Sequence, residues 1–224
     1  IWLTFPEGWR KEEFAQRLQT NLDNFSSSEF LNLAVDYEGK LFPDTYLIPR
    51  QASASAVFNL LVGTFEKKFD NQIRNEAQKI GLTPQQVLII ASIVEREARQ
   101  KNDKPLVAGI LIKRWRENWP LQADATIQYA VGSQRCQNLW QKQKCDWWEP
   151  VKKSDLSLES PYNTYKNKDL PPTPICNPGL DSIKAVVYYQ PTDYWFYLSD
   201  SQGVIHYAKN IKEHNENIEK YLRD

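Results

Sequence analysis

Apolar and polar positions in the first 50 residues follow two patterns, one extended and one helical. Residues 1–5 form a short apolar run that predicts a strand, and residues 11–22 repeat apolar side chains at helical spacing. The serines at 26–28 can cap a second helix, and residues 45–48 are typical of a returning strand. The pattern predicts a small strand-helix-helix-strand unit over residues 1–50.

Longer helical patterns begin near residue 53. Residues 54–80 carry an apolar stripe that predicts one packing helix, with Gly81 as its stop. Thr83 and Pro84 then form a helix start, and the helix that follows runs to Glu97 with apolar residues around nearly its whole circumference. A helix of this kind is buried on most sides, so the acids at its end need an explanation.

The remainder of the chain mixes helices, a hairpin and rigid loops. Further helices are predicted at 106–115, 127–131, 182–189 and 211–222, and a hairpin at 195–199 and 204–206. Residues 133–160 are polar, rich in Trp and irregular, and prolines are dense at 160–165 and 170–179, where they fix the path of the backbone. We therefore expect an α+β fold, with the small unit packed on a mostly helical domain at 51–224 that carries a small C-terminal β element.

Composition narrows the possible functions. Lys+Arg and Asp+Glu each number 28 without long blocks of either sign, which argues against a nucleic-acid partner. Eight Trp and eleven Tyr suit a carbohydrate groove, although core packing is their commoner role. Three cysteines and two histidines make no metal pattern, so neither a metal nor a cofactor is expected. Cys136 and Cys145 could close a loop as a disulfide, a question that the sequence leaves open.

The ends of the chain also carry information. No apolar run approaches the roughly 18–20 residues that cross a bilayer. The sequence lacks Met even at position 1, which predicts that a natural N-terminal segment with a signal or membrane anchor precedes it.

Two acids, Glu95 and Glu97, are the chemical candidates that the sequence itself brings forward. A carboxyl group in apolar surroundings keeps its proton to higher pH and can serve as a general acid near neutrality. On a helical wheel Glu95 lies at the margin of the apolar arc, whereas Glu97 points between Ile90 and Ile93. Glu95 is thus shielded on one side and reachable on the other, which modestly favours it. Neither His206 nor His214 lies in a pattern typical of nucleophilic catalysis, and both are expected to be surface or packing residues.

Six segments in order give a family resemblance that spans nearly the whole chain. They are FPEGW at 5–9, YEGKLFPDTY at 37–46, ASIVERE at 91–97, PLQADAT at 120–126, SPYNTY at 160–165 and LPPTPICNPG at 170–179. Together they resemble the signature stretches of the MltG-type (YceG-like) endolytic murein transglycosylases, and residues 1–50 loosely resemble a LysM glycan-binding module. Lys40, Ala123 and the long stretch at 133–158 depart from the family pattern.

The resemblance implies roles for individual residues. It makes Glu95 the catalytic acid and Glu97 a supporting structural acid. Residues that would line the substrate cleft are Glu38, Gln122, Asp124, Tyr162, Asn163 and Thr164. It also implies a single-pass anchor upstream, a site of action on the extracytoplasmic face of the bacterial inner (plasma) membrane, peptidoglycan glycan strands as substrate, and coupling to peptidoglycan synthases.

The implied reaction needs one carboxyl group. Protonated Glu95 would donate to the oxygen of the bond between N-acetylmuramic acid and N-acetylglucosamine, and its carboxylate would then take the proton of the muramic C6 hydroxyl as a 1,6-anhydro ring closes. Such cleavage would limit or terminate glycan strands. Two alternatives stay open: a muramidase that hydrolyses the same bond with Glu95 as acid and Asp124 as partner, and a scaffold that binds peptidoglycan without cutting it.

Overall fold

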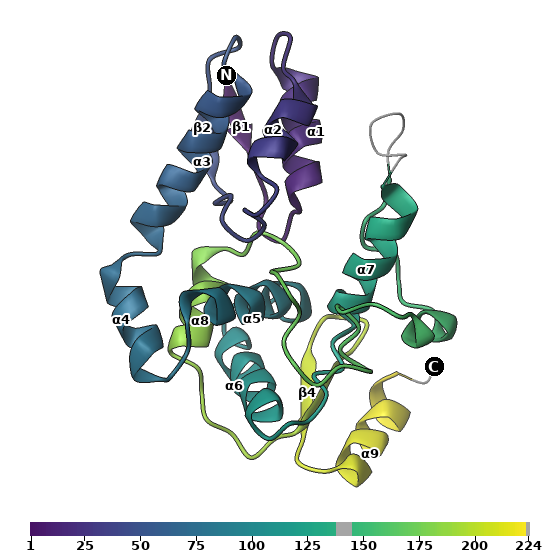
Figure 1. Ribbon diagram of the computed structural model, residues 1–224. Helices are drawn as coiled ribbons and strands as arrows, with labels where there is room; N and C mark the ends of the chain where they lie inside the picture. Colours follow the sequence, from purple (N-terminus) through teal and green to yellow (C-terminus); the bar gives the residue numbers. More distant parts are fainter. Residues whose placement is uncertain (138–144, 223–224) are drawn as a thin grey trace.

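The computed structural model describes residues 1–137 and 145–222 and has an α+β fold, as predicted (Figure 1). In chain order the elements are β1 (Trp2–Thr4), α1 (Lys11–Asn21), α2 (Ser27–Leu33), β2 (Thr45–Leu47), α3 (Ala54–Lys68), α4 (Asn71–Lys79), α5 (Pro84–Glu97), α6 (Lys104–Arg116), α7 (Asp124–Cys136), the 3₁₀ helix η1 (Lys153–Ser157), α8 (Leu180–Val187), β3 (Phe196–Ser199), β4 (Ile205–Ala208) and α9 (Ile211–Tyr221).

The N-terminal unit has the predicted strand-helix-helix-strand order. β1 and β2 pair antiparallel with Leu3 opposite Tyr46, and the rings of Phe5 and Phe14 stack with centroids 4.6 Å apart in its core. The same core includes Leu61 from α3 and Trp147 from a much later segment. Apolar packing therefore continues past residue 50, and a domain boundary at that position stays a prediction.

The helix predicted over residues 54–80 is two helices instead of one. α3 ends at Lys68, and α4 begins at Asn71 after Asp70, whose side chain accepts a hydrogen bond from the Ile73 amide at 2.9 Å. An aspartate in this N-cap position satisfies a free amide of the new helix and so favours a restart. Phe65 and Phe69 stack at the junction with centroids 5.3 Å apart, which fixes the bend.

α5 lies at the centre of the larger part of the molecule (Figure 1). Thr83 and Gln86 form the predicted capping box, and every residue from Val87 to Val94 is buried. α5 packs against α4, α6, α7 and α8. The helix reaches the surface at both ends: Pro84 and Gln85 are exposed at its start, and Glu95 and Glu97 are partly exposed where the buried helix emerges at its C-terminal end.

The later elements follow the prediction with one extension. α7 begins at Asp124, three residues before the predicted 127, and continues to Cys136, which forms a disulfide with Cys145. Part of the stretch predicted as irregular, 138–144, lies outside the described residues. β3 and β4 form the predicted hairpin, with Phe196 opposite Ala208, and α9 packs on both strands.

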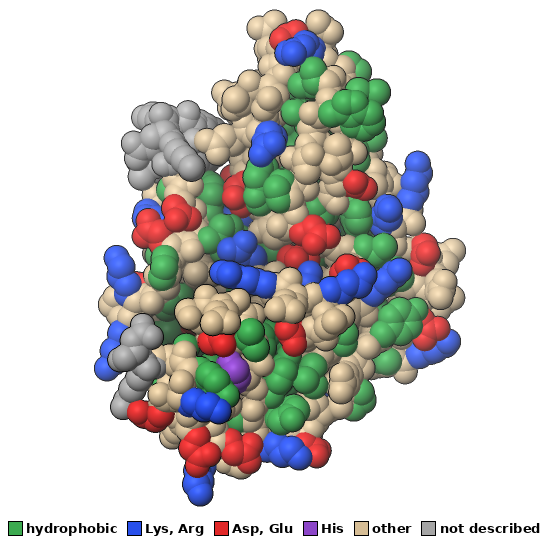
Figure 2. Space-filling view, turned by 180° about the vertical axis from the view of Figure 1, so that it is seen from behind, with side chains coloured by type: hydrophobic (Ala, Val, Ile, Leu, Met, Phe, Trp, Pro, Cys, Tyr) green, Lys and Arg blue, Asp and Glu red, His purple; other side chains and the backbone are tan. Residues whose placement is uncertain are grey.

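Two further properties concern the charges on the surface and the length and apolar character of the helices. In the space-filling view, Lys and Arg side chains form a band across the middle of one face, with Asp and Glu side chains above and below it (Figure 2). Neither sign of charge therefore holds this face alone. Across the described residues, no helix combines the length and the apolar character that crossing a membrane requires.

Candidate functional site

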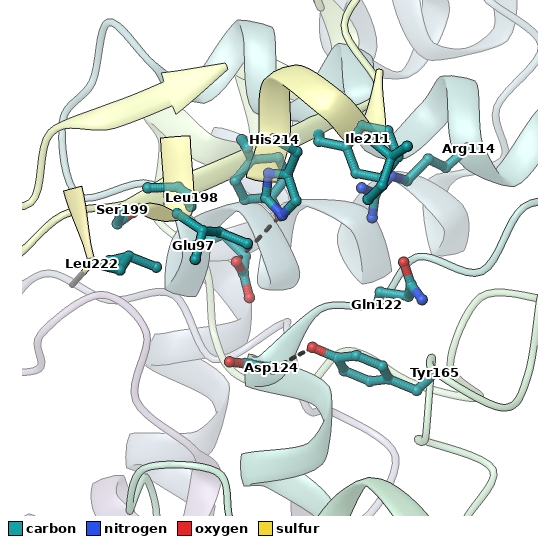
Figure 3. Close-up of a pocket in the computed structure, with 13 residues that line it drawn as sticks. Glu97, Arg114, Gln122, Asp124, Tyr165, Leu198, Ser199, Ile211, His214 and Leu222 are labelled. Atoms are coloured by element: carbon teal, nitrogen blue, oxygen red, sulfur yellow. Dashed lines mark hydrogen bonds between the residues drawn. The ribbon is translucent and has the colours of Figure 1, made fainter. Parts of the chain in front are cut away.

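A pocket of about 530 Å³ opens at the C-terminal end of α5 (Figure 3). Its walls come from α5, α6, the start of α7, the 162–165 loop, β3 and α9, which are segments far apart in sequence. The side chains that line it are Glu97, Arg114, Gln122, Asp124, Tyr165, Phe196, Tyr197, Leu198, Ser199, Ile211, His214, Ile218 and Leu222. Polar groups thus converge in a partly apolar cleft, the usual form of a small-molecule or glycan site.

Glu97 is the acid at the centre of this pocket. Its carboxyl oxygens accept two long hydrogen bonds, one from the Ala125 amide at 3.3 Å and one from the Tyr197 hydroxyl at 3.2 Å. Burial raises the pKa of Glu97 to about 7, and the nearby Asp124 carboxylate adds to the rise, while the two hydrogen bonds and Arg114 oppose it. Glu97 is therefore poised between its protonated and ionised forms near neutral pH, as a general acid and base must be.

Gln122 and Asp124, two of the residues expected at a substrate cleft, line the same pocket as Glu97. Gln122 has a φ of 52°, in the left-handed region, and its amide donates to the Thr164 carbonyl at 3.0 Å. Asp124 starts α7, where its carboxylate accepts a 2.6 Å hydrogen bond from the Tyr165 hydroxyl. These contacts fix an amide and a carboxylate on the wall that faces the α9 side of the pocket (Figure 3).

Asn163 and Thr164 were also expected to line the cleft, and in the structure neither is among the residues that line this pocket. Both are fully buried. The Asn163 amide donates to the carbonyls of Leu156 and Leu158, and the Thr164 hydroxyl accepts from the Ala123 amide at 3.1 Å. They support the pocket wall from behind, because buried polar groups need internal partners. The next residue of the same motif, Tyr165, is the one that reaches the pocket.

Glu95, the expected catalytic acid, lies outside the pocket. One carboxyl oxygen pairs with Lys104 Nζ at 2.9 Å, and the other accepts from the Gly179 amide at 2.9 Å and the Ser182 hydroxyl at 2.7 Å. The Glu95 and Lys104 side chains are only 8% and 6% exposed. Both carboxyl oxygens of Glu95 are therefore already occupied by protein donors, which leaves the group little capacity for a ligand. Through these contacts the Glu95 side chain links the end of α5 to α6 and to the start of α8.

Glu38 and Tyr162, also expected at the cleft, lie at a separate cavity of about 120 Å³ between the N-terminal unit and α7. Glu38 accepts hydrogen bonds from the Asn177 side chain at 2.8 Å and the Lys11 amide at 3.2 Å. Burial and the nearby Glu12 carboxylate raise the pKa of Glu38 to about 8. The Tyr162 hydroxyl is 2.7 Å from the Thr173 hydroxyl. These two residues therefore join parts of the fold rather than lining the Glu97 pocket.

The prediction missed the pocket residues that come from α6, β3 and α9. Arg114 donates to the carbonyls of Trp195 and Leu121 at 2.8 and 2.5 Å, which ties α6 to the hairpin and to the start of the 122–126 segment. Tyr197 reaches Glu97 from β3, and His214 comes from α9. Arg114 belongs to a basic run with Lys113 and Arg116 in the last turn of α6, so the local sequence did not single it out. In the part of the chain that the structure describes, no group of three His, Cys, Asp or Glu side chains could hold a metal ion.

The fold and the site define an α+β protein in which a single buried acid with a near-neutral pKa faces an open, partly aromatic cleft. The sequence model of the YceG-like family matches residues 1–220. The chain therefore belongs to the YceG-like family.

Individual relatives agree with this assignment. An endolytic murein transglycosylase of Bacillus subtilis is 30% identical over 94% of this chain, and one of Streptococcus pneumoniae is 31% identical over 83% of it. The chain spans about half the length of the first relative and a third of the second, at 56% and 32%. A crystal structure of a yceG-like protein from Listeria monocytogenes covers 96% of this chain, with a TM-score of 0.81 and 27% identity. The match covers 75% of the Listeria chain.

Proposed function

We propose that this chain is the catalytic part of a peptidoglycan lytic transglycosylase and that Glu97 is its acid and base. The observation that carries the proposal is the position of Glu97 in the large pocket, with a pKa raised to about 7 by burial and by Asp124. The names of the relatives supply the reaction class. Proposed along with it are action outside the cytoplasm on peptidoglycan glycan strands, a membrane anchor upstream, and coupling to peptidoglycan synthases.

The first step is cleavage of the glycosidic bond. Protonated Glu97 donates its proton to the glycosidic oxygen as the bond from that oxygen to the muramic C1 breaks, so the leaving sugar departs as an alcohol. Positive character develops at C1 and the ring oxygen. The carboxylates of Glu97 and Asp124 both lie at this pocket and can stabilise that charge.

The second step closes the ring. The muramic C6 hydroxyl attacks C1, and the Glu97 carboxylate takes the hydroxyl proton, which restores the acid and leaves a 1,6-anhydro end. No water is consumed, and the attack is favoured because the nucleophile belongs to the same sugar and is held at high effective concentration. Glu97 suits both steps because its two hydrogen bonds are long enough to leave either protonation state accessible.

Glu95 supports this chemistry from a distance under the proposal. Its ion pair with Lys104 links the end of α5 to the start of α6, and its contacts to Gly179 and Ser182 link it to α8. The last turn of α5 is therefore anchored two residues before Glu97. The N-terminal LysM-like unit would hold neighbouring sugars of the strand, and cleavage within strands would limit their length.

A second candidate is hydrolysis of the same bond, favoured by the Asp124 carboxylate in the Glu97 pocket. Inverting and retaining glycosidases both use two carboxyl groups in one cleft. In that case Asp124 would activate a water or act as a nucleophile. Its hydrogen bond from Tyr165 at 2.6 Å instead occupies one of its oxygens, which favours the transglycosylase.

Product chemistry tests the proposal directly. Purified peptidoglycan is treated with the native chain and with Glu97→Gln, and the released fragments are analysed by mass spectrometry. Anhydromuramyl ends that disappear in the variant are expected. Reducing muramic ends, heavier by one water, would instead indicate a muramidase. Binding without any products would indicate a scaffold that holds peptidoglycan without cutting it.

A further inference from the structure

His214 is a polar residue of the Glu97 pocket that the proposed reaction does not use. The residue lies in the first turn of α9 and lines the pocket. Figure 3 shows its imidazole on the same side of the pocket as the Glu97 carboxyl, and above it in that view. The ring stacks on Phe196, with centroids 5.1 Å apart and an interplanar angle of 24°.

The structure fixes the first turn of α9 firmly. The Asn210 side chain caps the helix by accepting from the Glu213 amide at 3.0 Å, and the Glu213 carboxylate accepts from the Lys209 amide at 2.8 Å. Asn217, one turn further on, donates to the Tyr207 carbonyl of β4 at 3.2 Å. His214 sits between these two tethers, so its ring has a defined position without a hydrogen bond of its own.

Within the described residues, neither ring nitrogen of His214 has a hydrogen-bond partner. Nδ1 is buried and unpartnered, which leaves Nε2 as the nitrogen available to a ligand in the pocket. Burial and the positive charge of Arg114 lower the pKa of His214, which favours the neutral ring. A neutral imidazole carries one N–H and one lone pair. An N–H at Nδ1 would be buried without an acceptor, which favours the proton on Nε2.

We propose that His214 is a substrate-binding residue whose Nε2–H donates a hydrogen bond to a hydroxyl or N-acetyl oxygen of the sugar held against Glu97. The inference rests on the proposed function for the identity of the ligand as a glycan. A pre-positioned donor beside the acid holds the reacting sugar in register and costs little ordering entropy when the ligand binds. Two neighbouring residues of β3 contact the two side chains: Tyr197 donates a hydrogen bond to Glu97, and the Phe196 ring stacks on His214.

The test measures glycan binding separately from cleavage. Peptide-free glycan strands from peptidoglycan are titrated calorimetrically into Glu97→Gln and into double variants that add His214→Phe or His214→Gln. Phe keeps a ring to stack on Phe196 and removes the donor, whereas Gln restores an N–H near the place of Nε2. We expect binding about 5- to 10-fold weaker for His214→Phe, the scale of one lost hydrogen bond, and binding within about twofold for His214→Gln.

Asn215→Phe serves as the matched control, because it adds the same ring at an exposed position of the same helix. Cleavage assays use the single variant His214→Phe, which keeps Glu97; its KM should rise with a smaller change in kcat. Two results would overturn the inference. One is that the His214→Phe variant binds the glycan as tightly as the chain that keeps His214. The other is that the His214→Gln variant binds as weakly as His214→Phe, which would assign the effect to ring packing. Weaker binding of His214→Phe in a chain that cleaves no peptidoglycan would instead retain the inference and refute the proposed reaction.

Discussion

Replacing each of the two glutamates at the end of α5 by glutamine should produce opposite effects on activity and stability. Glu97→Gln removes the proton that the reaction needs, and loss of a general acid typically lowers the rate by about 10²–10⁴-fold. Glu95→Gln removes a charge that the pocket does not contain. We expect it to keep most activity in whatever fraction of the protein remains folded.

The stability changes can be worked out from the contacts. Glu95→Gln leaves the Lys104 ammonium, 6% exposed, without its counter-ion, and breaking a buried pair in this way costs about 3–5 kcal/mol. For a protein of this size that corresponds to a Tm about 6–20 °C lower. The equivalent change at Lys104, Lys104→Met, should cost less when combined with Glu95→Gln than the two single changes cost in sum.

Glu97→Gln should change stability in the other direction, and only at higher pH. The pKa of Glu97 is about 7 in the folded protein and about 4.5 in the unfolded chain, so the folded state binds more protons between these values. The native protein therefore loses stability as pH rises through this window, up to about 3 kcal/mol for this group. Glutamine does not titrate, so the variant should match the native Tm near pH 4.5 and exceed it near pH 8.

Differential scanning calorimetry from pH 4.5 to 8 and product release from peptidoglycan at pH 6.5 measure both properties on the same preparations. Glu38 also titrates in this range, but it is present in both proteins and cancels in the comparison. Loss of activity in a folded Glu95→Gln variant, together with an active Glu97→Gln variant, would refute the assignment. An unchanged Tm in Glu95→Gln would refute the structural role of the ion pair.

Three further outcomes are expected. Activity should fall above about pH 7 as Glu97 loses its proton, and Tyr197→Phe should move that limb to higher pH, because the Tyr197 hydrogen bond lowers the pKa of Glu97; initial rates across pH check this. Asn177→Ala should lower stability by about 2–4 kcal/mol in denaturant titrations, since its side-chain oxygen accepts two buried backbone amides at 2.9 Å. Reduction of the Cys136–Cys145 disulfide, which closes a loop of sequence separation 9, should cost about 2–3 kcal/mol and lower the Tm in reducing buffer without abolishing cleavage.

The elements of the fold were predictable where local signals act. The capping box at Thr83 and the apolar circumference of α5 are both present in the sequence, and both are seen in the structure. The break between α3 and α4 also had a local signal in Asp70, but the continuous apolar stripe over 54–80 masked it. An apolar stripe shows which face of the chain is buried. Two consecutive helices that bury the same face against one core therefore carry one continuous stripe.

The walls of the pocket were less predictable because they depend on contacts between distant segments. Gln122 and Asp124 were found through their motif, yet Tyr197 and His214 follow Glu97 by 100 residues or more. Helical periodicity places a side chain on a face of its own helix and gives no information about which other element covers that face. Asn163 and Thr164 show the converse: they belong to a motif and act behind the wall, where their hydrogen bonds hold its shape.

The contrast between Glu95 and Glu97 shows why burial alone does not select a catalytic acid. Both carboxyl groups lie at the end of one buried helix, and both are removed from bulk water. Glu95 receives a cation and two close donors from α6 and α8. Glu97 receives two long hydrogen bonds and faces another carboxylate. The number and charge of the surrounding donors decide whether a carboxyl group is free to meet a ligand, and the farthest donor to Glu97 lies 100 residues away. The helical wheel placed both acids at the end of a buried helix, and it gave no sign of the cavity that β3 and α9 leave beside Glu97.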